Sequence, residues 1–200
     1  MNIKKDDIAG VILAGGMGRR MGGTDKGLQN FRQAPLALHA LMRLSGQVGN
    51  VIINANRNIA VYEGFGVPVI CDKQTDFAGP LAGMHAALSH ITEPYLITVP
   101  CDVPQFPLDL VERLAEPFSR QPDLQLTVAS TSGRTHPVFC MMKTEVFESM
   151  EEFLSNGGRK IDAWYAQLKH QAVDFGDETA FHNVNTLDEL RALEKQAKQP

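Results

Sequence analysis

The first half of the chain alternates short runs of consecutive apolar residues with longer segments in which apolar residues recur every three or four positions. The short runs predict buried strands, and the longer period predicts amphipathic helices. The predicted strands are Ile8–Ala14, Val51–Asn54, Val67–Ile70 and Tyr95–Val99, and the predicted helices are Pro35–Ser45, Leu81–Ile91 and Leu108–Ser119. This alternation predicts an α/β fold with a single doubly wound, mostly parallel sheet and helices on both faces.

The pattern of the second half is less regular. It predicts two strands around a turn at Ser132-Gly133, then two helices, an edge strand and a closing helix. These elements are Leu124–Ser130, His136–Met142, Thr144–Leu154, Arg159–Leu168, Ala172–Phe175 and Leu187–Lys195. Thr186 and Glu189 form the sequence pattern of a capping box for the last helix. Since no repeat or linker interrupts the chain, we expect one domain over residues 1–200.

Composition narrows the possible classes of protein. The 200 residues are 44% hydrophobic, enough for a core, and the formal net charge of −4 gives no basic face for nucleic acid. No apolar run approaches the roughly 18 residues of a membrane span, and the polar segment Met1–Asp7 is unlike a signal peptide. Three widely spaced cysteines, Cys71, Cys101 and Cys140, are typical of reduced thiols. We therefore expect a cytoplasmic protein that binds neither membrane nor nucleic acid.

Polar or glycine residues follow each predicted strand of the first half. They are the loop that starts at Gly15, then Asn54, Asp72 and Asp102. In doubly wound sheets, ligands bind beyond the carboxyl ends of the strands. We therefore expect these four places to meet at one edge of the sheet.

The loop within Leu13–Lys26 is rich in glycine and carries three cations, Arg19, Arg20 and Lys26, opposed only by Asp25. Glycines let backbone amides approach anionic oxygens closely, so the loop predicts phosphate binding. It lacks the Gly-Lys-Ser/Thr of a Walker A loop, and its glycine spacing is one residue too long for a dinucleotide fold. The remaining alternative is a glycine turn with solvated arginines.

The same loop resembles the signature loop of nucleotidyltransferases with the sugar-nucleotide pyrophosphorylase fold, a Rossmann variant like that of the nucleotide-diphospho-sugar transferases. The chain is still more similar to the molybdenum cofactor guanylyltransferases, and the similarity extends over nearly its whole length. The matching blocks are Leu13–Gly16, Arg20–Gly22, Asp25–Gly27, Asn54–Arg57, Gly79–Gly83, Cys101-Asp102, His136-Pro137 and Asn183–Thr186. The order and spacing of these blocks are more specific than any one of them. Met17-Gly18 stands where related chains vary.

This resemblance implies a reaction. GTP and molybdenum-molybdopterin give the guanine dinucleotide cofactor and pyrophosphate, when the terminal phosphate of the pterin attacks the α-phosphorus of GTP. The family requires Mg²⁺. An N-terminal half of about residues 8–103 would bind GTP and a C-terminal half of about 104–200 would bind the acceptor. We expect a monomer that makes transient contacts with molybdopterin-handling and molybdoenzyme maturation proteins.

The resemblance also assigns roles to residues. It implies that Asp102 holds the metal and that Arg20, Lys26 and Asp102 are catalytic. The implied GTP contacts are Leu13, Ala14, Gly15, Gly16, Lys26, Asn54, Asp72, Gly79, Gly83 and Asp102. The molybdopterin side would comprise His136, Arg159, Lys160, Asn183 and Asn185. The other five histidines, with Trp164 and Tyr165, are expected to be structural.

The residues alone leave alternatives open at several of these positions. Asp102 is also suited to cap a helix after Pro104, and Asp72 to be an ordinary surface carboxylate. An aspartate at position 72 suits either the guanine edge or a pair of ribose hydroxyls. Arg159-Lys160 is also typical of a solvated helix face. For the whole chain, the alternatives are cytidylyl transfer, nucleotidyl transfer to a sugar phosphate, or a non-catalytic nucleotide carrier.

Overall fold

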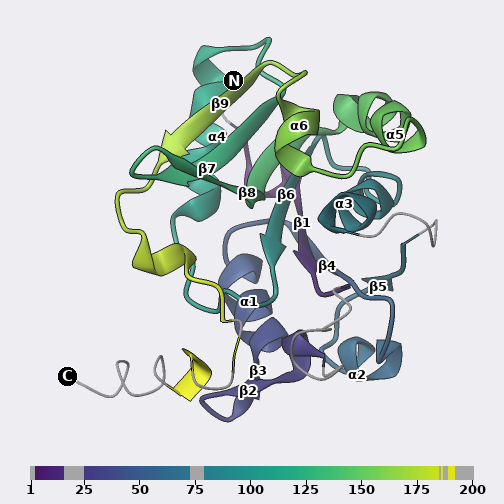
Figure 1. The fold of residues 1–200 in the computed structure, drawn as a ribbon, viewed down its shortest axis with the longest axis vertical. Coiled ribbons are helices and arrows are strands. Elements are labelled where there is room, and N and C mark those ends of the chain that lie inside the picture. The colour runs from purple at the N-terminus through teal and green to yellow at the C-terminus, as the bar shows by residue number, and fades with distance from the viewer. Residues whose placement is uncertain (1–2, 16–24, 73–78, 185, 187–188, 192–200) are drawn as a thin grey trace.

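The structure is a computed structural model that describes residues 3–15, 25–72, 79–184, 186 and 189–191. Its centre is a seven-stranded sheet with the strand order β5-β4-β1-β6-β8-β7-β9 (Figure 1). The strands are β1 Ile8–Leu13, β4 Asn50–Asn54, β5 Val69–Ile70, β6 Tyr95–Pro100, β7 Leu126–Thr131, β8 Arg134–Lys143 and β9 His170–Asp174. All sheet pairs are parallel except those of β8, which runs antiparallel to β6 and β7. The predicted mostly parallel, doubly wound sheet is confirmed.

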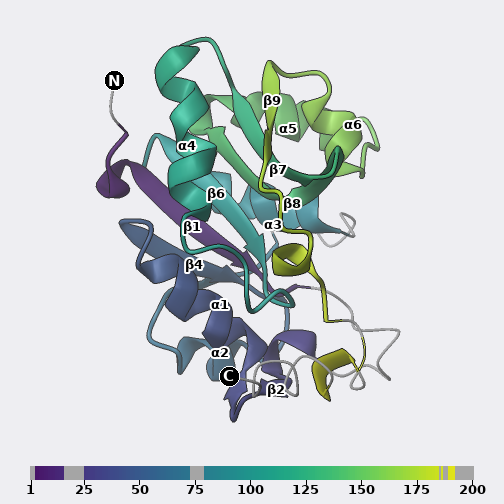
Figure 2. The same ribbon diagram turned by 90° about the vertical axis from the view of Figure 1, so that its left-hand side faces the viewer.

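Helices cover both faces of this sheet. They are α1 Leu36–Ser45, α2 Ile59–Glu63, α3 Pro80–Leu88, α4 Leu110–Arg120, α5 Phe147–Ser155 and α6 Ile161–Tyr165. Most buried side chains of α1 and α4 share one apolar cluster, and those of α3, α5 and α6 share a second. Figure 1 shows α3 and α5 on one side of the sheet, and Figure 2 shows α1 and α4 on the face turned toward the viewer.

Strand β1 shows why a strand at the centre of the sheet needs a continuous run of apolar residues. Ile8 and Ile12 point into the cluster beneath α1 and α4, whereas Ala9 and Val11 point into the cluster beneath α3. All four side chains are almost fully buried. A strand covered on both faces has no polar face, which is the pattern expected of a parallel sheet.

Several predicted elements are present with shifted ends. The segment predicted as a helix over Thr144–Leu154 starts as a 3₁₀ turn, η4 Thr144–Val146, and continues as α5. The predicted helix Arg159–Leu168 is shorter in the structure, because α6 spans only five residues. The predicted edge strand is confirmed, since β9 is the last strand of the sheet.

The end of the chain is partly described. The expected capping box is confirmed, because the Glu189 amide donates to Thr186 Oγ1 at 3.1 Å and the Thr186 amide donates to Glu189 Oε2 at 3.2 Å. The rest of the predicted closing helix lies outside the described residues, except for Leu190 and Arg191.

The sequence pattern missed the short elements. These are α2, the hairpin of β2 Asn30–Phe31 with β3 Ala34–Pro35, and the 3₁₀ turns η1 Lys5–Asp7, η3 Lys26–Leu28 and η5 Thr179–Phe181. A helix of about one turn is too short for its apolar residues to show a helical period in the sequence. The β2–β3 hairpin turns at Arg32 and Gln33, with φ of 47° and 68°, so it lacks the Asn or Gly that usually marks such a turn.

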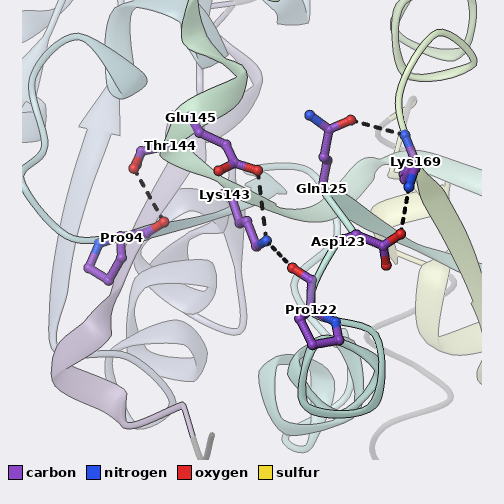
Figure 3. A network of polar contacts seen from close by, with 8 residues as sticks. All are labelled: Pro94, Pro122, Asp123, Gln125, Lys143, Thr144, Glu145 and Lys169. Atoms are coloured by element: carbon purple, nitrogen blue, oxygen red, sulfur yellow. Dashed lines mark hydrogen bonds and ion pairs between the residues drawn. The ribbon is translucent and has the colours of Figure 1, made fainter.

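The edge of the sheet at which β6, β7 and β9 begin is closed by polar contacts (Figure 3). Lys143 Nζ donates to the Pro122 carbonyl at 2.6 Å and lies 3.7 Å from Glu145 Oε1. Lys169 Nζ pairs with Asp123 Oδ2 at 2.5 Å. These contacts tie the loop before β7 to the end of β8 and to the loop before β9.

Two further features bear on the sequence-based expectations. Cys71, Cys101 and Cys140 are all free thiols, and the last two are buried. Among the described residues, no helix has the length and apolar character needed to cross a membrane.

The β7–β8 turn offers a test of backbone strain. Gly133 has a φ of +79°, so Gly133→Ala should lower the free energy of unfolding by about 1 kcal/mol, measured by urea denaturation. Gly46→Ala is the matched control, because Gly46 has a φ of −72° and nothing lies within 4 Å of an added Cβ. Equal losses of stability in both variants would contradict this assignment of strain.

Candidate functional site

The carboxyl ends of three parallel strands meet at the other edge of the sheet. Leu13, the last residue of β1, pairs with Asn54 of β4 on one side and with Pro100 of β6 on the other. The Ala14 amide donates to the Asn54 carbonyl at 2.8 Å, and the Cys101 amide donates to the Leu13 carbonyl at 3.2 Å. The first residues after β1 therefore lie between the ends of β4 and β6, as expected for the residues that follow the predicted strands.

Asp72 is held by two asparagine side chains. Asn54 Nδ2 donates to Asp72 Oδ1 at 2.9 Å, and Asn56 Nδ2 donates to Asp72 Oδ2 at 2.7 Å. The Asp72 amide returns a hydrogen bond of 2.9 Å to Asn56 Oδ1. The carboxylate therefore has a fixed orientation, unlike an ordinary surface aspartate. Asn56 received no role from the sequence, although two asparagines spaced two apart on an extended segment face the same side.

Two glycines allow close approach around Asn54. A Cβ on Gly83 would overlap Asn54 Oδ1, because α3 packs directly against the end of β4. A Cβ on Gly15 would lie 3.0 Å from Asn56 Nδ2 and 3.2 Å from Asn54 Oδ1. Gly79 precedes α3 with a φ of +136°, and Pro80 is the first helical residue, one position before the predicted start at Leu81.

Asp102 follows β6 at the same edge. Lys26 Nζ lies 3.4 Å from Asp102 Oδ2, and Asn183 Nδ2 donates to Asp102 Oδ1 at 3.3 Å. The Val184 amide donates to the Asp102 carbonyl at 2.9 Å. Burial raises the pKa of the Asp102 carboxyl, and the Lys26 ammonium and the Asn183 amide oppose this shift. The alternative that Asp102 caps a helix is wrong, because α4 begins at Leu110.

The donor set around Asp102 limits what cation it can hold. Within the described ranges there is no group of three or more His, Cys, Asp or Glu side chains suited to a metal. A protein-only cage of carboxylates is therefore not formed by these residues. A single carboxylate at 13% side-chain exposure fits Mg²⁺, which takes one or two carboxylates and completes its shell with water and phosphate oxygens.

His136 lies at this edge because β8 is antiparallel to β6, so β8 begins where β6 ends. Its Nε2 lies 2.7 Å from Thr131 Oγ1, and its ring stacks on Phe181 at a centroid distance of 4.6 Å. Burial and then the charge of Arg134 lower the pKa of His136. The chain continues from Phe181 to Asn183, so the fold brings His136 and Asn183 to the region of Asp102.

Arg159 and Lys160 lie between α5 and α6. Arg159 Nη1 donates to the carbonyls of Leu154 at 3.0 Å and Gly158 at 2.6 Å, which fixes the end of α5. Lys160 is exposed and directly precedes α6. The described contacts thus give Arg159 a structural task and leave the predicted role of both residues toward a ligand untested.

Some predicted site residues lie outside the described residues, namely Gly16, Arg20 and Asn185, together with Arg19. Residues predicted to be structural are mostly found in such roles. Trp164 and Tyr165 are buried, and His85 is buried and stacked on Phe147. His39 bonds the Phe31 carbonyl at 2.6 Å, and His170 bonds the Leu168 carbonyl at 3.0 Å. His90 and His182 are exposed.

Comparison with known proteins gives consistent matches. Residues 10–172 match the model of the MobA-like NTP transferase domain. A protein of Bordetella petrii is 55% identical over 96% of this chain and 99% of its own length, and one of Cupriavidus metallidurans is 52% identical over 98% of both. Each of these relatives is named molybdenum cofactor guanylyltransferase.

Solved structures share the fold at low sequence identity. Molybdopterin-guanine dinucleotide biosynthesis protein A of Archaeoglobus fulgidus superposes with a TM-score of 0.79 at 21% identity, covering 96% of this chain and 100% of that one. A CMP:2-keto-3-deoxy-manno-octonic acid synthetase complexed with CTP gives 0.75 at 14% identity, covering 97% and 100%. At these identities the likeness shows the fold alone.

The close packing at Gly83 can be tested by stability. Gly83→Ala should lower the free energy of unfolding by about 1–3 kcal/mol, because the added methyl group overlaps Asn54. The same substitution in an Asn54→Ala background should cost less. Chemical denaturation of the four proteins measures the difference, and an equal cost in both backgrounds would show that Asn54 does not restrict position 83.

Proposed function

This chain belongs to the MobA-like NTP transferase family, and from that premise we propose that it transfers GMP from GTP to the terminal phosphate of molybdenum-molybdopterin. The products are the guanine dinucleotide cofactor and pyrophosphate. Relatives that are 52–55% identical over nearly the full length, and named for this activity, support the choice of substrates. The single structural observation that carries the proposal is the placement of the Lys26–Asp102 pair beside the end of β1.

The phosphates of GTP are proposed to lie over the residues that follow β1. The backbone of Leu13, Ala14 and Gly15 borders this space, and glycine at position 15 allows close approach by an anion. Lys26 supplies a cation at the end of β6. Gly16 and Arg20 are proposed to complete this contact, on the strength of the family motif.

The nucleoside is proposed to bind on the side of Asp72. Each carboxylate oxygen already accepts one asparagine amide, and a carboxylate offers about four lone-pair sites in all. One further donor per oxygen can therefore be accepted. The N1–H and N2–H groups of guanine form such a pair, and so do two ribose hydroxyls. Gly79, which precedes α3, and Gly83, where α3 packs against Asn54, are proposed to border the same side.

Mg²⁺ is proposed as the divalent ion, with Asp102 as its protein ligand. When bound, the ion would supply charge neutralisation at the α-phosphate and the leaving pyrophosphate. Asn183 orients the carboxylate through Oδ1, while Lys26 lies against Oδ2. No general base is required, because the phosphate of the pterin is already ionised near neutral pH.

The acceptor is proposed to bind toward β8 and α6. His136, Asn183 and Asn185 would border the molybdopterin phosphate, and Lys160 with Arg159 would give a basic wall for this anionic molecule. The lowered pKa of His136 favours a neutral imidazole at pH 7, so this ring would contribute hydrogen bonds and not charge. GTP and acceptor halves would form one domain, because β6 of the first half pairs with β8 of the second.

The alternatives have less support. A solved relative in fold binds CTP, but 14% identity does not transfer a base preference to this chain. A non-catalytic carrier has no use for a buried carboxylate paired with a lysine at the proposed phosphate site. Neither reading accounts for relatives of over 50% identity that are named guanylyltransferases.

Nucleotide titration tests the proposed function. Purified protein with Mg²⁺ should bind GTP at least tenfold more tightly than CTP, UTP or ATP in calorimetry, since a lost pair of hydrogen bonds costs roughly 1.4 kcal/mol or more. ITP lacks the guanine N2 amino group, so weaker binding of ITP would assign Asp72 to the base, and equal binding would favour the ribose. CTP binding as tight as GTP binding would overturn the guanylyl assignment.

Asp102 can be tested directly. Asp102→Ala should abolish formation of the dinucleotide, measured as pyrophosphate release, while circular dichroism and thermal unfolding show an intact fold. The reason is that the variant lacks the only carboxylate proposed to hold the metal. Lys169→Ala is a suitable control, because the Lys169–Asp123 pair lies at the opposite edge of the sheet (Figure 3). Normal turnover in Asp102→Ala would refute the metal assignment.

A further inference from the structure

Asp25, which directly precedes Lys26, is buried to an unusual degree for a charged residue. It is the one acidic residue among those described whose surface is almost fully covered, with 6% exposed. The sequence suggested that Asp25 offsets the cations of the glycine-rich loop. Burying a carboxylate is costly unless it is well paired, so its contacts indicate what it stabilises.

Four groups surround the Asp25 carboxylate. Oδ1 accepts a hydrogen bond of 2.7 Å from Tyr62 Oη and one of 3.1 Å from the Gly27 amide. Oδ2 accepts 3.0 Å from Asn58 Nδ2 and lies 3.7 Å from Arg57 Nε. Three of these four partners come from α2 and the loop before it.

The Tyr62 hydroxyl acts as a hydrogen-bond donor to Asp25. The tyrosine is fully buried on α2, and burial followed by the hydrogen bond to Asp25 raises the pKa of its hydroxyl far above the ordinary value. The phenol therefore favours its protonated form, in which it donates to Asp25. Its ring packs edge-to-face on Phe65 at 5.7 Å, which fixes its direction.

These contacts fix the backbone on both sides of Lys26. Asp25 caps the single 3₁₀ turn η3 through the Gly27 amide. A Cβ on Gly27 would overlap Tyr62 Oη and lie 3.3 Å from Cys101 Sγ, so this backbone is wedged between α2 and the residue before Asp102. The Lys26 side chain therefore projects from a turn whose backbone cannot shift without breaking the Asp25 contacts.

The segment from Asn54, at the end of β4, to Asn58, just before α2, has contacts on both sides of the proposed GTP site. Asn54 and Asn56 hold Asp72, whereas Arg57 and Asn58 hold Asp25. A lysine side chain has four rotatable bonds, and fixing its origin reduces the freedom it loses when it binds an anion. The segment therefore connects the nucleoside side with the phosphate side.

We propose that Tyr62 and Asn58 are positioning residues for Lys26. They hold the Asp25 carboxylate, Asp25 holds the η3 turn, and the turn directs the Lys26 ammonium to the triphosphate beside Asp102. This inference rests on the proposed function, because it assumes that Lys26 contacts GTP. It adds Tyr62, Asn58 and Asp25 to the residues on which triphosphate binding depends.

The test is a double-mutant cycle on Mg–GTP binding. Tyr62→Phe removes one hydroxyl and should raise the dissociation constant about threefold to tenfold, part of what a hydrogen bond to a charged group is worth. In a Lys26→Ala background the same substitution should change the dissociation constant less than about twofold, because the residue through which it acts is gone. Equal effects in both backgrounds would overturn the proposal.

Guanosine binding separates positioning from general damage. Guanosine has no phosphate, so Tyr62→Phe should leave its dissociation constant unchanged, whereas a general loss of structure would weaken guanosine and GTP alike and would refute the proposal. Tyr95→Phe is the matched control, since Tyr95 is partly buried at the opposite end of β6 and packs on Phe118. It should leave both affinities unchanged.

Asn58→Gly provides a second variant if Tyr62→Phe folds poorly. Asn58 has a φ of 52°, which glycine adopts readily, so this change removes the donor to Asp25 with little backbone strain. It should show the same dependence on Lys26, and unchanged GTP binding would refute the inference. Failure of the wild-type protein to bind GTP would instead refute the proposed function, so the two failures are distinguishable.

Discussion

Parallel pairing of β1 with β4 on one side and β6 on the other is the constraint on which the rest of the structure depends. It places the residues after Leu13, Asn54 and Pro100 at one edge of the sheet. The backbone bonds of Ala14 to Asn54 and of Cys101 to Leu13 extend this pairing just beyond the strands. The start of the glycine-rich loop, a carboxylate and an amide, far apart in the sequence, become neighbours for this reason.

The elements at this edge pack so closely that larger side chains at some positions would overlap their neighbours and lower stability, and glycines at these positions avoid the overlap. Glycine at position 83 lets α3 approach Asn54, and glycine at position 27 lets the η3 turn approach Tyr62. Asp25 and Asp102 are both largely buried carboxylates, but the groups that surround them differ. Asp25 is saturated with donors, whereas burial raises the pKa of Asp102, which one lysine and one amide offset only in part. The first arrangement suits a fixed support and the second suits a cation-binding group.

Sequence reasoning succeeded where the signal is local. Continuous apolar runs identified the strands, and the Ser132-Gly133 pair marked a turn that the structure contains. It failed where the elements are too short for a period or use unusual residues. The helix α2 has five residues, and the β2–β3 turn adopts positive φ at Arg32 and Gln33. The missed helix is the one that supplies Tyr62 to Asp25.

The sequence by itself determined the order of strands and helices, the loop suited to phosphate, and the motif residues expected at the strand ends, because each of these depends on residues close together in the chain. Only the tertiary structure decided that β8 runs antiparallel beside β6 and so brings His136 to the same edge as Asp102. It also decided that Asn56 holds Asp72 and that Tyr62 and Asn58 hold Asp25. The partners in these bonds are 16, 37 and 33 residues apart, respectively. The spacing of apolar residues along the chain does not predict contacts between residues so far apart. Such a contact forms only when the sheet has set the distance between its loops.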